Sequence, residues 1–508
     1  MLGISHTVLY VLLFIALYFE VFILLTYIEN RNSIKEEREN SDTEPNSFPM
    51  TSIIVPCWNE ETTIVKTIDS LLALDYPKDK FEIIIVDNAS TDKSKEIMEN
   101  YQQKNKNIRN IFLDKNSGFS KGNNIGIKAS RGKYVILLNN DCLVEKDWLK
   151  QLISTAKKDK KIFAVNPKVL LYPSYIYPKI KISPDFAVKD VSISNSSLLE
   201  YTDDKGALLD LIWPDDPNNR VFTLEVPFDK KIDKFITCKL NLLKFNFPKK
   251  SLPPLKRMNF SREIMKIYCS RSTKNAEVYK VTLKINIGLI AERNKYDKVQ
   301  NAGIVVFQEG SGRDIGAIVR YQRQYYEFDK GQFDTEREIY AACAVATLYN
   351  REALDKIGYL DENFFMYYED VEISERARLY GYKSFFNPRA IVRHLHALSS
   401  KEWSPFFIFN VEKGRYLHLL FYFPYPFHLF IIGFLRLFSN GIVRLILNFG
   451  RKKDRLYSLE YLRLTWYFAT NSFRFTDVVI KKRLSTSRKR LIDNLKGITS
   501  GRWYFENR

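Results

Sequence analysis

Short apolar runs alternate with helix-like segments from residue 51 onward, and this order constrains the fold more than any other feature. The runs are SIIVP (52–56), EIIIVD (82–87), NIFLD (110–114) and YVILL (134–138). Short β-rich runs of this kind predict strands that are covered on both faces. Their alternation with helices predicts a parallel sheet with right-handed crossovers, and therefore an α/β fold.

Polar residues stand at the end of each predicted strand. They are Pro56 and Glu60 for the first run, Asp87, Asn88 and Ser90 for the second, Asp114 and Asn116 for the third, and Asp141 for the fourth. The carboxyl ends of parallel strands lie at one edge of a sheet, where α/β domains bind their ligands. Each residue alone is also an ordinary cap or turn former. Together they predict a cleft with hydrogen-bond acceptors for a base and a ribose.

The segment NSGFSKGNNIG (116–126) spaces three glycines four residues apart. This pattern is neither the GxGxxG dinucleotide fingerprint nor a P-loop, so neither hydride transfer nor an ATPase is predicted. A glycine turn that enters a helix, with Lys121 at the start of that helix, suits a phosphate group.

Asp141 is a candidate metal ligand. A diphosphate held in the predicted cleft would carry negative charge that a divalent cation must offset. An aspartate at a strand end is an oxygen ligand for Mg²⁺ or Mn²⁺. For a single aspartate, a structural cap is the alternative.

The net charge of +19, from 78 Lys and Arg against 59 Asp and Glu, predicts an anionic partner such as a phosphorylated substrate, acidic lipid or nucleic acid. No RNA- or DNA-binding motif accompanies the basic residues, so no nucleic-acid partner is expected. The five cysteines form no CxxC pair, which indicates a reduced, cytosol-facing compartment.

Residues 1–28 contain no Lys or Arg and are long enough to span a bilayer. We interpret them as a transmembrane anchor rather than a cleaved signal or a buried helix, because a basic start and a cleavage site are missing. Residues 29–48 follow as a polar linker whose basic residues favour a cytoplasmic body. We therefore expect a protein of the cell membrane with its catalytic domain on the cytoplasmic face.

The alternation of strand and helix stops between residues 171 and 298. Segments such as VFTLEV, KFITCKLNLLKF and VYKVTLKINIGLIAE predict an inserted, β-sandwich-like domain. Residues 404–508 are aromatic and then basic, and Pro424 and Pro426 interrupt their apolar part. We interpret this region as membrane-associated, interfacial helices on an anionic lipid surface, with a solvated helix face as the alternative.

The chain resembles the family 2 glycosyltransferases of the GT-A fold, and in particular their rhamnosyltransferase-like members. The resemblance rests on SIIVPCWNE, IIIVDNASTDKS, NSGFSKGNNIG and VILLNNDCLVEKDWL, followed by QNAGIVVFQEGSGRDIG, DENFFMYYEDVEISERARLYGY and PRAIVRHLHALSS. It implies a donor-binding half at residues 49–170 and an acceptor or catalytic half at residues 299–403, separated by the insert.

The resemblance also implies which residues bind the donor and its metal. Asp87 and Asn88, with Pro56 and Glu60, look like the contacts to the nucleotide, to which the strand-end and glycine arguments add Ser90 and Lys121. Asp141 looks like the last Asp of the DxD metal element, whose first Asp is replaced by Asn139. His394 is the candidate for the missing ligand, because related enzymes place a His there and imidazole binds such cations. A structural role is the alternative for a lone His.

Glu369 and Asp370 open a predicted helix, where the helix dipole alone favours acidic residues. In the family, the second residue of this pair is the general base that takes the proton of the acceptor hydroxyl in an inverting transfer. Asp370 is therefore the predicted catalytic residue. Glu369, Arg313 and Asp314 are predicted on the acceptor side.

Glu375 and Ala344 depart from the residues that are usual at their positions, which indicates a different acceptor pocket. The QxxRW signature of processive synthases is absent, which favours transfer of a single sugar. The combined prediction is a metal-dependent, inverting glycosyltransferase that moves one sugar, rhamnose being favoured, from a nucleotide-diphosphate sugar to a lipid-linked glycan or a surface polysaccharide precursor. The alternatives are a sugar nucleotidyltransferase and a non-catalytic membrane protein that binds glycan or acts as a scaffold.

Overall fold

The computed structural model describes residues 48–172, 295–307, 310–320, 323–395, 404–422 and 452–484, with strand segments between residues 174 and 286 and a few residues between 435 and 443. The predicted anchor at residues 1–28 lies outside the described residues, as does the linker up to residue 47. Within the described part of the chain, none of the helices has the length and apolar character needed to cross a membrane.

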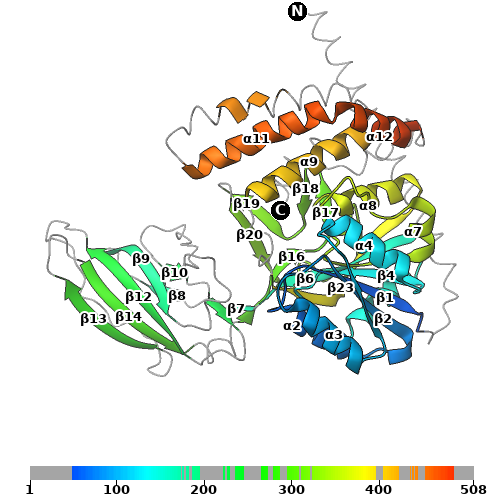
Figure 1. The fold of residues 1–508 in the computed structure, drawn as a ribbon. Coiled ribbons are helices and arrows are strands. Elements are labelled where there is room, and N and C mark those ends of the chain that lie inside the picture. The colour runs from blue at the N-terminus through cyan, green and yellow to red at the C-terminus, as the bar shows by residue number, and fades with distance from the viewer. Residues whose placement is uncertain are drawn as a thin grey trace, which may run out of the picture.

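The predicted donor-binding half contains the expected parallel sheet (Figure 1). Its strands run in the order β4-β1-β2-β3, and all three pairs are parallel. Their bounds are β1 (Thr51–Cys57), β2 (Phe81–Asp87), β3 (Ile108–Phe112) and β4 (Tyr134–Leu138). The connecting helices are α2 (Ile64–Leu72), α3 (Ser94–Lys104) and α4 (Gly118–Ala129). The predicted alternation of strand and helix is therefore confirmed.

The sheet continues beyond β4 with strands from both halves of the domain. From β4 outward the order is β22 (Ala346–Asn350), β6 (Ile162–Leu171), β16 (Lys298–Asn301), β20 (Arg323–Phe328) and β19 (Ala317–Arg320). Of these, β22 is antiparallel to both β4 and β6, so the complete sheet is mixed. A further strand, β23 (Lys383–His394), runs parallel to β6 and also pairs with β5 (Cys142–Val144) and β21 (Arg337–Ile339).

Both faces of the sheet are covered, as the apolar runs predict. In β1, Ile53 and Val55 belong to the core with α2 and α5 (Trp148–Ala156), whereas Ile54 faces α4, α7 (Arg351–Ile357) and α8 (Glu369–Leu379). This strict alternation places the apolar residues of one strand in two separate cores.

The glycine segment agrees with the prediction at its start and differs beyond it. Gly118, with φ of +84°, begins α4, whereas Gly122 and Gly126 lie inside this helix rather than in a turn. A Cβ on Gly122 would lie 2.8 Å from Asn88 Nδ2, and one on Gly126 would lie 3.2 Å from Val86 Cγ2. The four-residue spacing therefore serves close packing of α4 on the sheet.

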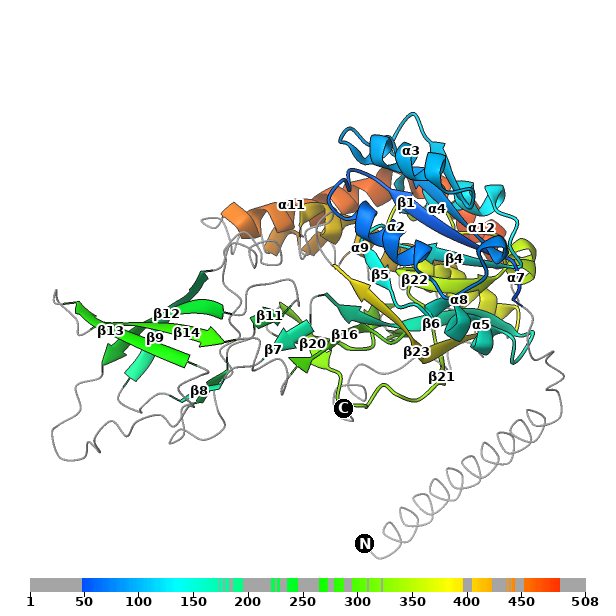
Figure 2. The same ribbon diagram turned by 90° about the horizontal axis from the view of Figure 1, so that it is seen from below.

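The insert leaves the main sheet at β6 and returns at β16, and these two strands pair with Val299 opposite Leu170. Its described strands include the antiparallel sheet β13-β14-β12-β9, formed by β13 (Met265–Ser272), β14 (Val278–Asn286), β12 (Phe235–Lys244) and β9 (Phe186–Ser194). Shorter pairs join β8 (Lys179–Lys181) to β10 (Val221–Thr223), and β7 (Ser174–Ile176) to β11 (Val226–Phe228) and β15 (Lys295–Tyr296). Figure 2 shows the larger sheet to one side of the main domain. A two-sheet sandwich remains a prediction.

The C-terminal region adds α9 (Pro405–Tyr422), α11 (Lys452–Thr470) and α12 (Ser472–Leu484) to the acceptor half. Leu417 and Phe421 of α9 are buried in one core with Val371 of α8 and with Leu464 and Phe468 of α11. The expected lipid-facing surface is therefore wrong for the second half of α9, because protein covers its apolar side chains.

Candidate active site

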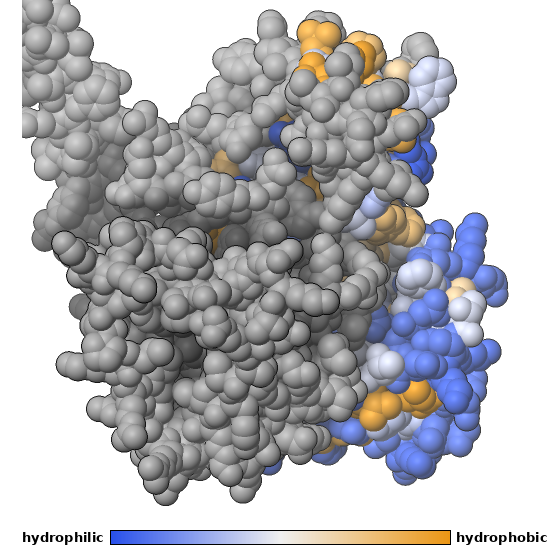
Figure 3. Space-filling view, turned by 90° about the vertical axis from the view of Figure 1, so that its left-hand side faces the viewer, coloured by the Kyte–Doolittle hydropathy of each residue, from blue (hydrophilic) through white to orange (hydrophobic). Residues whose placement is uncertain are grey.

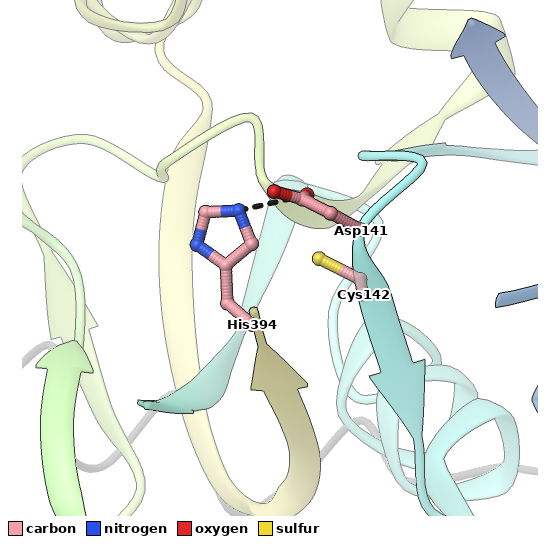
Figure 4. Close-up of side chains that lie close together, drawn as sticks. All are labelled: Asp141, Cys142 and His394. Atoms are coloured by element: carbon pink, nitrogen blue, oxygen red, sulfur yellow. Dashed lines mark ion pairs between the residues drawn. The ribbon is translucent and has the colours of Figure 1, made fainter. Parts of the chain in front are cut away.

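Asp141 and His394 meet at the end of the main sheet. Asp141 lies directly before β5, and His394 is the last residue of β23, where it stands opposite Cys142 in the antiparallel register. Leu395 N donates a hydrogen bond of 2.9 Å to the carbonyl oxygen of Asp141 and fixes the two chains at this point. As a result, His394 Nε2 lies 2.9 Å from Asp141 Oδ1, and both side chains are buried (Figure 4).

These two side chains fit a divalent cation. His394 Nδ1 lies 2.7 Å from Gln300 Oε1. In the tautomer in which Nδ1 donates to that oxygen, the lone pair of Nε2 can bind a cation beside Asp141. Two ligands at adjacent corners of an octahedron, with bonds of about 2.1 Å, lie roughly 3 Å apart. The spacing of the Asp141 and His394 ligand atoms agrees with that value.

Cys142 is the third potential ligand atom in this cluster, all of whose ligand atoms lie within 4.8 Å of one another. Burial raises the pKa of the Cys142 thiol well above its ordinary value, and the charge of Asp141 raises it further. The sulfur is therefore protonated, and Mg²⁺ and Mn²⁺ prefer oxygen and imidazole ligands. Of the three residues, Asp141 and His394 therefore carry the ligand types that suit Mg²⁺ or Mn²⁺.

Gln300→Leu is expected to weaken Mn²⁺ binding roughly ten- to hundredfold, because leucine cannot hold the imidazole of His394 in its orientation. The concentration of MnCl2 that gives half of the maximal thermal stabilisation measures this change. Gln103→Leu, at an exposed position of α3, is the matched control and should leave it unaltered. An unchanged midpoint for Gln300→Leu would show that Gln300 does not support a metal ligand.

Asp370 lies in the first turn of α8 and is held by two backbone groups. Val371 N donates to its Oδ1 at 2.8 Å, and Ala344 N donates to its Oδ2 at 3.3 Å. Burial raises the pKa of the Asp370 carboxyl, and the backbone hydrogen bonds oppose this effect in part. A raised pKa suits a carboxylate that must accept a proton near neutral pH.

The entry to α8 is strained. Tyr367 and Tyr368 have φ of +69° and +70°, the left-handed region that non-glycine residues seldom adopt. Tyr368 is fixed there by its hydroxyl, which accepts from Gly312 N at 2.9 Å and donates to Gly310 O at 3.3 Å. Such strain concentrates at functional sites, and here it sets the direction in which Glu369 and Asp370 enter the helix.

The segment Cys343–Val345 connects the two carboxylates. Ala344 N donates to Asp370, while Val345 O accepts from Asn139 N at 2.8 Å, two residues before Asp141. The chain just before Asp141 and the side chain of Asp370 therefore contact the same short segment. This segment links the surroundings of the predicted metal ligand to those of the predicted base.

Two buried amides extend this arrangement toward the acceptor side. Asn166 Oδ1 accepts from Cys343 N at 2.7 Å, and Asn166 Nδ2 donates to Asn301 Oδ1 at 2.9 Å. Asn301 Nδ2 in turn donates to Asp314 Oδ1 at 2.8 Å. Burial raises the pKa of the Cys343 thiol well above its ordinary value, and the charges of Asp314 and Asp370 raise it further. Its neighbour Arg313 lies over the ring of Phe307 at 5.6 Å.

The predicted donor residues around Asp87 lie at the carboxyl ends of β1 and β2. Asp87 accepts hydrogen bonds from Ser90 N and Ser90 Oγ, and Ser90 Oγ also accepts from Asn59 N at 2.9 Å. Asn88 Oδ1 accepts from Ser117 N at 3.3 Å. These bonds join the loops after β1, β2 and β3 into one rim.

The three other predicted donor residues lie in different surroundings, two of them buried and one exposed. Pro56 is buried within β1, opposite Val86. Glu60 is buried and accepts from Thr63 Oγ1 at 2.8 Å, so it also braces the start of α2. Lys121 is exposed on α4.

Gln300, Asn166 and Asn301 were missed by the sequence argument, although Gln300 and Asn301 open the segment QNAGIVVF on which the resemblance partly rests. Their partners are up to 177 residues away in the chain. Pairing of β6 with both β16 and β23, at Leu170 and Leu171, brings them to the site.

Residues 52–199 match the family described as "Glycosyl transferase family 2". This match confirms the predicted family resemblance for that part of the chain. The rhamnosyltransferase-like subgroup remains a prediction.

Relatives of known name are similar over about a hundred residues. Glycosyltransferase AglE of Haloferax volcanii is 33% identical over 109 residues, which cover 22% of the chain and 36% of AglE. The dolichyl N-acetyl-alpha-D-glucosaminyl phosphate 3-beta-D-2,3-diacetamido-2,3-dideoxy-beta-D-glucuronosyltransferase of Methanococcus voltae is 37% identical over 112 residues, or 22% of the chain and 35% of that protein. The chain thus spans about a third of the length of these relatives.

Two solved structures are also similar. GalNAc-T7 with UDP, GalNAc and Mn²⁺ has 13% sequence identity and a TM-score of 0.41. The similarity covers 84% of the present chain and 58% of the GalNAc-T7 chain. Mannosyltransferase PcManGT from Pyrobaculum calidifontis, with GDP-Man and Mn²⁺, has 12% sequence identity and a TM-score of 0.35. The similarity covers 93% of the present chain and 92% of the PcManGT chain.

Proposed function

We propose that the chain is a glycosyltransferase that moves one sugar from a nucleotide-diphosphate donor to a glycan hydroxyl, with inversion at the anomeric carbon. The observation that carries this proposal concerns residues 343–345, where Ala344 N bonds to Asp370 and Val345 O bonds to Asn139 N, two residues before Asp141. Asp141 in turn lies 2.9 Å from His394. The family match over residues 52–199 supports the donor half.

In this reaction Asp370 is the general base. Its carboxylate takes the proton of the acceptor hydroxyl while the hydroxyl oxygen forms a bond to the anomeric carbon, and the bond from that carbon to the diphosphate oxygen breaks. The backbone N–H groups of Ala344 and Val371 fix the carboxylate for this task. A divalent cation bound by Asp141 and His394 would offset the charge that remains on the nucleoside diphosphate.

Asp87 and Asn88 would bind the base and ribose of the donor, because they lie on the rim formed by the loops after β1, β2 and β3. Rhamnose is the favoured sugar by resemblance. The Methanococcus voltae relative is named for transfer to a dolichyl-linked sugar phosphate, which supports a lipid-linked glycan as acceptor.

Membrane association is supported by the outer face of α11. Leu459, Arg463 and Trp466 follow the i, i+4, i+7 spacing of one helix face, and Trp466 is 72% exposed. Figure 3 shows apolar side chains at the top of the molecule, where Figure 1 has the C-terminal helices. Exposed Trp beside Arg is typical of helices at a bilayer surface. We place this face on the cytoplasmic side of the cell membrane.

The test is product analysis with the purified full chain. UDP-, GDP- and dTDP-sugars are supplied with MnCl2 and a panel of octyl glycosides, and release of nucleoside diphosphate is measured. We expect one donor to give release that rises with one acceptor and stops with EDTA. Pyrophosphate from a nucleoside triphosphate and a sugar phosphate would instead identify a nucleotidyltransferase. No product from any combination would favour a non-catalytic protein.

A further inference from the structure

A lysine outside the predicted catalytic regions lies beside the Glu369–Asp370 pair. Lys413 belongs to α9, and its side chain is buried. Its charge opposes the upward shift that burial imposes on the pKa of the Glu369 carboxyl. Gly414, the next residue of α9, packs against Tyr368, which directly precedes Glu369, so the helix that carries Lys413 contacts the start of α8.

The backbone fixes this proximity. A Cβ on Gly414 would lie 2.7 Å from the Cβ of Tyr368, closer than real Cβ atoms approach. Glycine at this position therefore lets α9 contact the residue that directly precedes Glu369. Tyr368 is itself held by its hydrogen bonds to Gly310 and Gly312. The position of Lys413 is thus set by helix packing.

One carboxyl oxygen of Glu369 is buried without the hydrogen bond that would replace its lost contact with water. Its Oε2 atom is buried and has no hydrogen-bond partner within the described residues. An orphaned buried carboxyl oxygen is costly, and a ligand hydroxyl would remove that cost. The atom lies one residue from Asp370, where the acceptor must bind if Asp370 is the base.

We propose that Lys413 and Glu369 form a subsite for two hydroxyl groups of the acceptor sugar, beside the hydroxyl that Asp370 deprotonates. This inference rests on the proposed function. An ammonium donates to a hydroxyl oxygen, and a carboxyl oxygen accepts from a hydroxyl, so the two side chains match two positions of one sugar ring. A phosphate fits this subsite poorly, because it would face the carboxyls of both Glu369 and Asp370.

The charge state of Lys413 agrees with this role. Burial lowers the pKa of its amine to about 8, with the nearby charge of Arg474 in the same direction and Glu369 opposing it. The amine is therefore mostly protonated at pH 7 and can donate hydrogen bonds.

The test compares KM values for the acceptor and for the donor, with the nucleotide sugar and octyl glycoside that give the fastest turnover in the assay above. For Lys413→Met we expect the acceptor KM to rise at least about tenfold, while the donor KM stays within about twofold. Lys481→Met, an exposed lysine of α12 that pairs with Asp477, removes the same charge and should change neither value.

Deoxy analogues of the acceptor separate binding from a merely structural role. Wild type should lose about tenfold in kcat/KM when the hydroxyl bound by Lys413 is removed, whereas Lys413→Met should not distinguish the two acceptors. If the methionine variant does not fold, Lys413→Leu, which also lacks a donor, replaces it in the same comparison. An unchanged acceptor KM, or an equal response of both proteins to every deoxy acceptor, would overturn the subsite while the proposed function stands. Failure of wild type to release nucleoside diphosphate would instead overturn the proposed function.

Discussion

Asp370→Asn is expected to lower the rate of sugar transfer by about a thousandfold, which corresponds to about 4 kcal/mol in the activation free energy. The amide has the size of the carboxylate and can still accept from Val371 N, but it cannot take a proton from the acceptor. Donor and Mn²⁺ binding depend on the other side of the segment Cys343–Val345 and should be retained. Steady-state rates, together with the donor-induced thermal shift, measure both expectations.

The pH dependence gives a second readout of the same substitution. Burial raises the pKa of Asp370, so the base is protonated and inactive in acid, and the wild-type rate should rise as pH increases through that raised pKa. The residual rate of Asp370→Asn should lack this rise. Asp355→Asn, at an exposed position of α7, is the matched control and should behave as wild type. A variant at position 370 with normal turnover would remove Asp370 from the mechanism.

The order of the local elements could be predicted from sequence because each strand and helix carries its own periodicity. The apolar runs that contain Ile53 and Ile136 have the length and composition of doubly covered strands, and both became central strands. Asp141 and His394 were placed at strand ends by the same argument, supplemented by the family resemblance. Their contact at 2.9 Å follows from the pairing of β5 with β23, which no local pattern reports.

Other predictions depend on sequence patterns that are compatible with two different structures. An apolar helix is equally favoured by lipid and by a protein core, so the sequence of α9 was interpreted as interfacial although Leu417 and Phe421 are buried. In the same way, glycines at four-residue spacing indicate either a turn or a helix face in close contact, and Gly126 belongs to the second kind. Only the packing partners, which are distant in sequence, decide between the two meanings.

Glu372→Gln is expected to destabilise the folded protein by about 3–5 kcal/mol at pH 7, because it removes a buried carboxylate that two cations share. Glu372 is fully buried, and it pairs with Arg376 Nη2 at 2.6 Å and with Lys482 Nζ at 2.6 Å. Lys482 also binds Asp361 at 2.6 Å and lies 4.4 Å from the centre of the Phe421 ring. The network therefore ties α12 and α9 to α8.

Urea unfolding at several pH values measures this contribution. The cations beside Glu372 lower the pKa of its carboxyl to about 2 from 4.5, so its stabilising effect is complete above about pH 4.5 and is lost as pH falls toward 2. Glu372→Gln should therefore lose stability at pH 7 and show a weaker acid dependence than wild type. Asp477→Asn, in the exposed pair with Lys481, should cost no more than about 1 kcal/mol.

The same network reaches the catalytic helix. Glu372 lies two residues after Asp370 in the first turn of α8. Without the ion pair between Glu372 and Lys482 of α12, this turn is held less firmly, and so is the base that it positions. We therefore expect the transfer rate of folded Glu372→Gln to fall with no change in donor KM. An equal urea midpoint for Glu372→Gln and wild type at pH 7 would show that the ion pairs with α12 do not stabilise α8. The proposed role of Lys413 would then be the one remaining link between the C-terminal helices and the site.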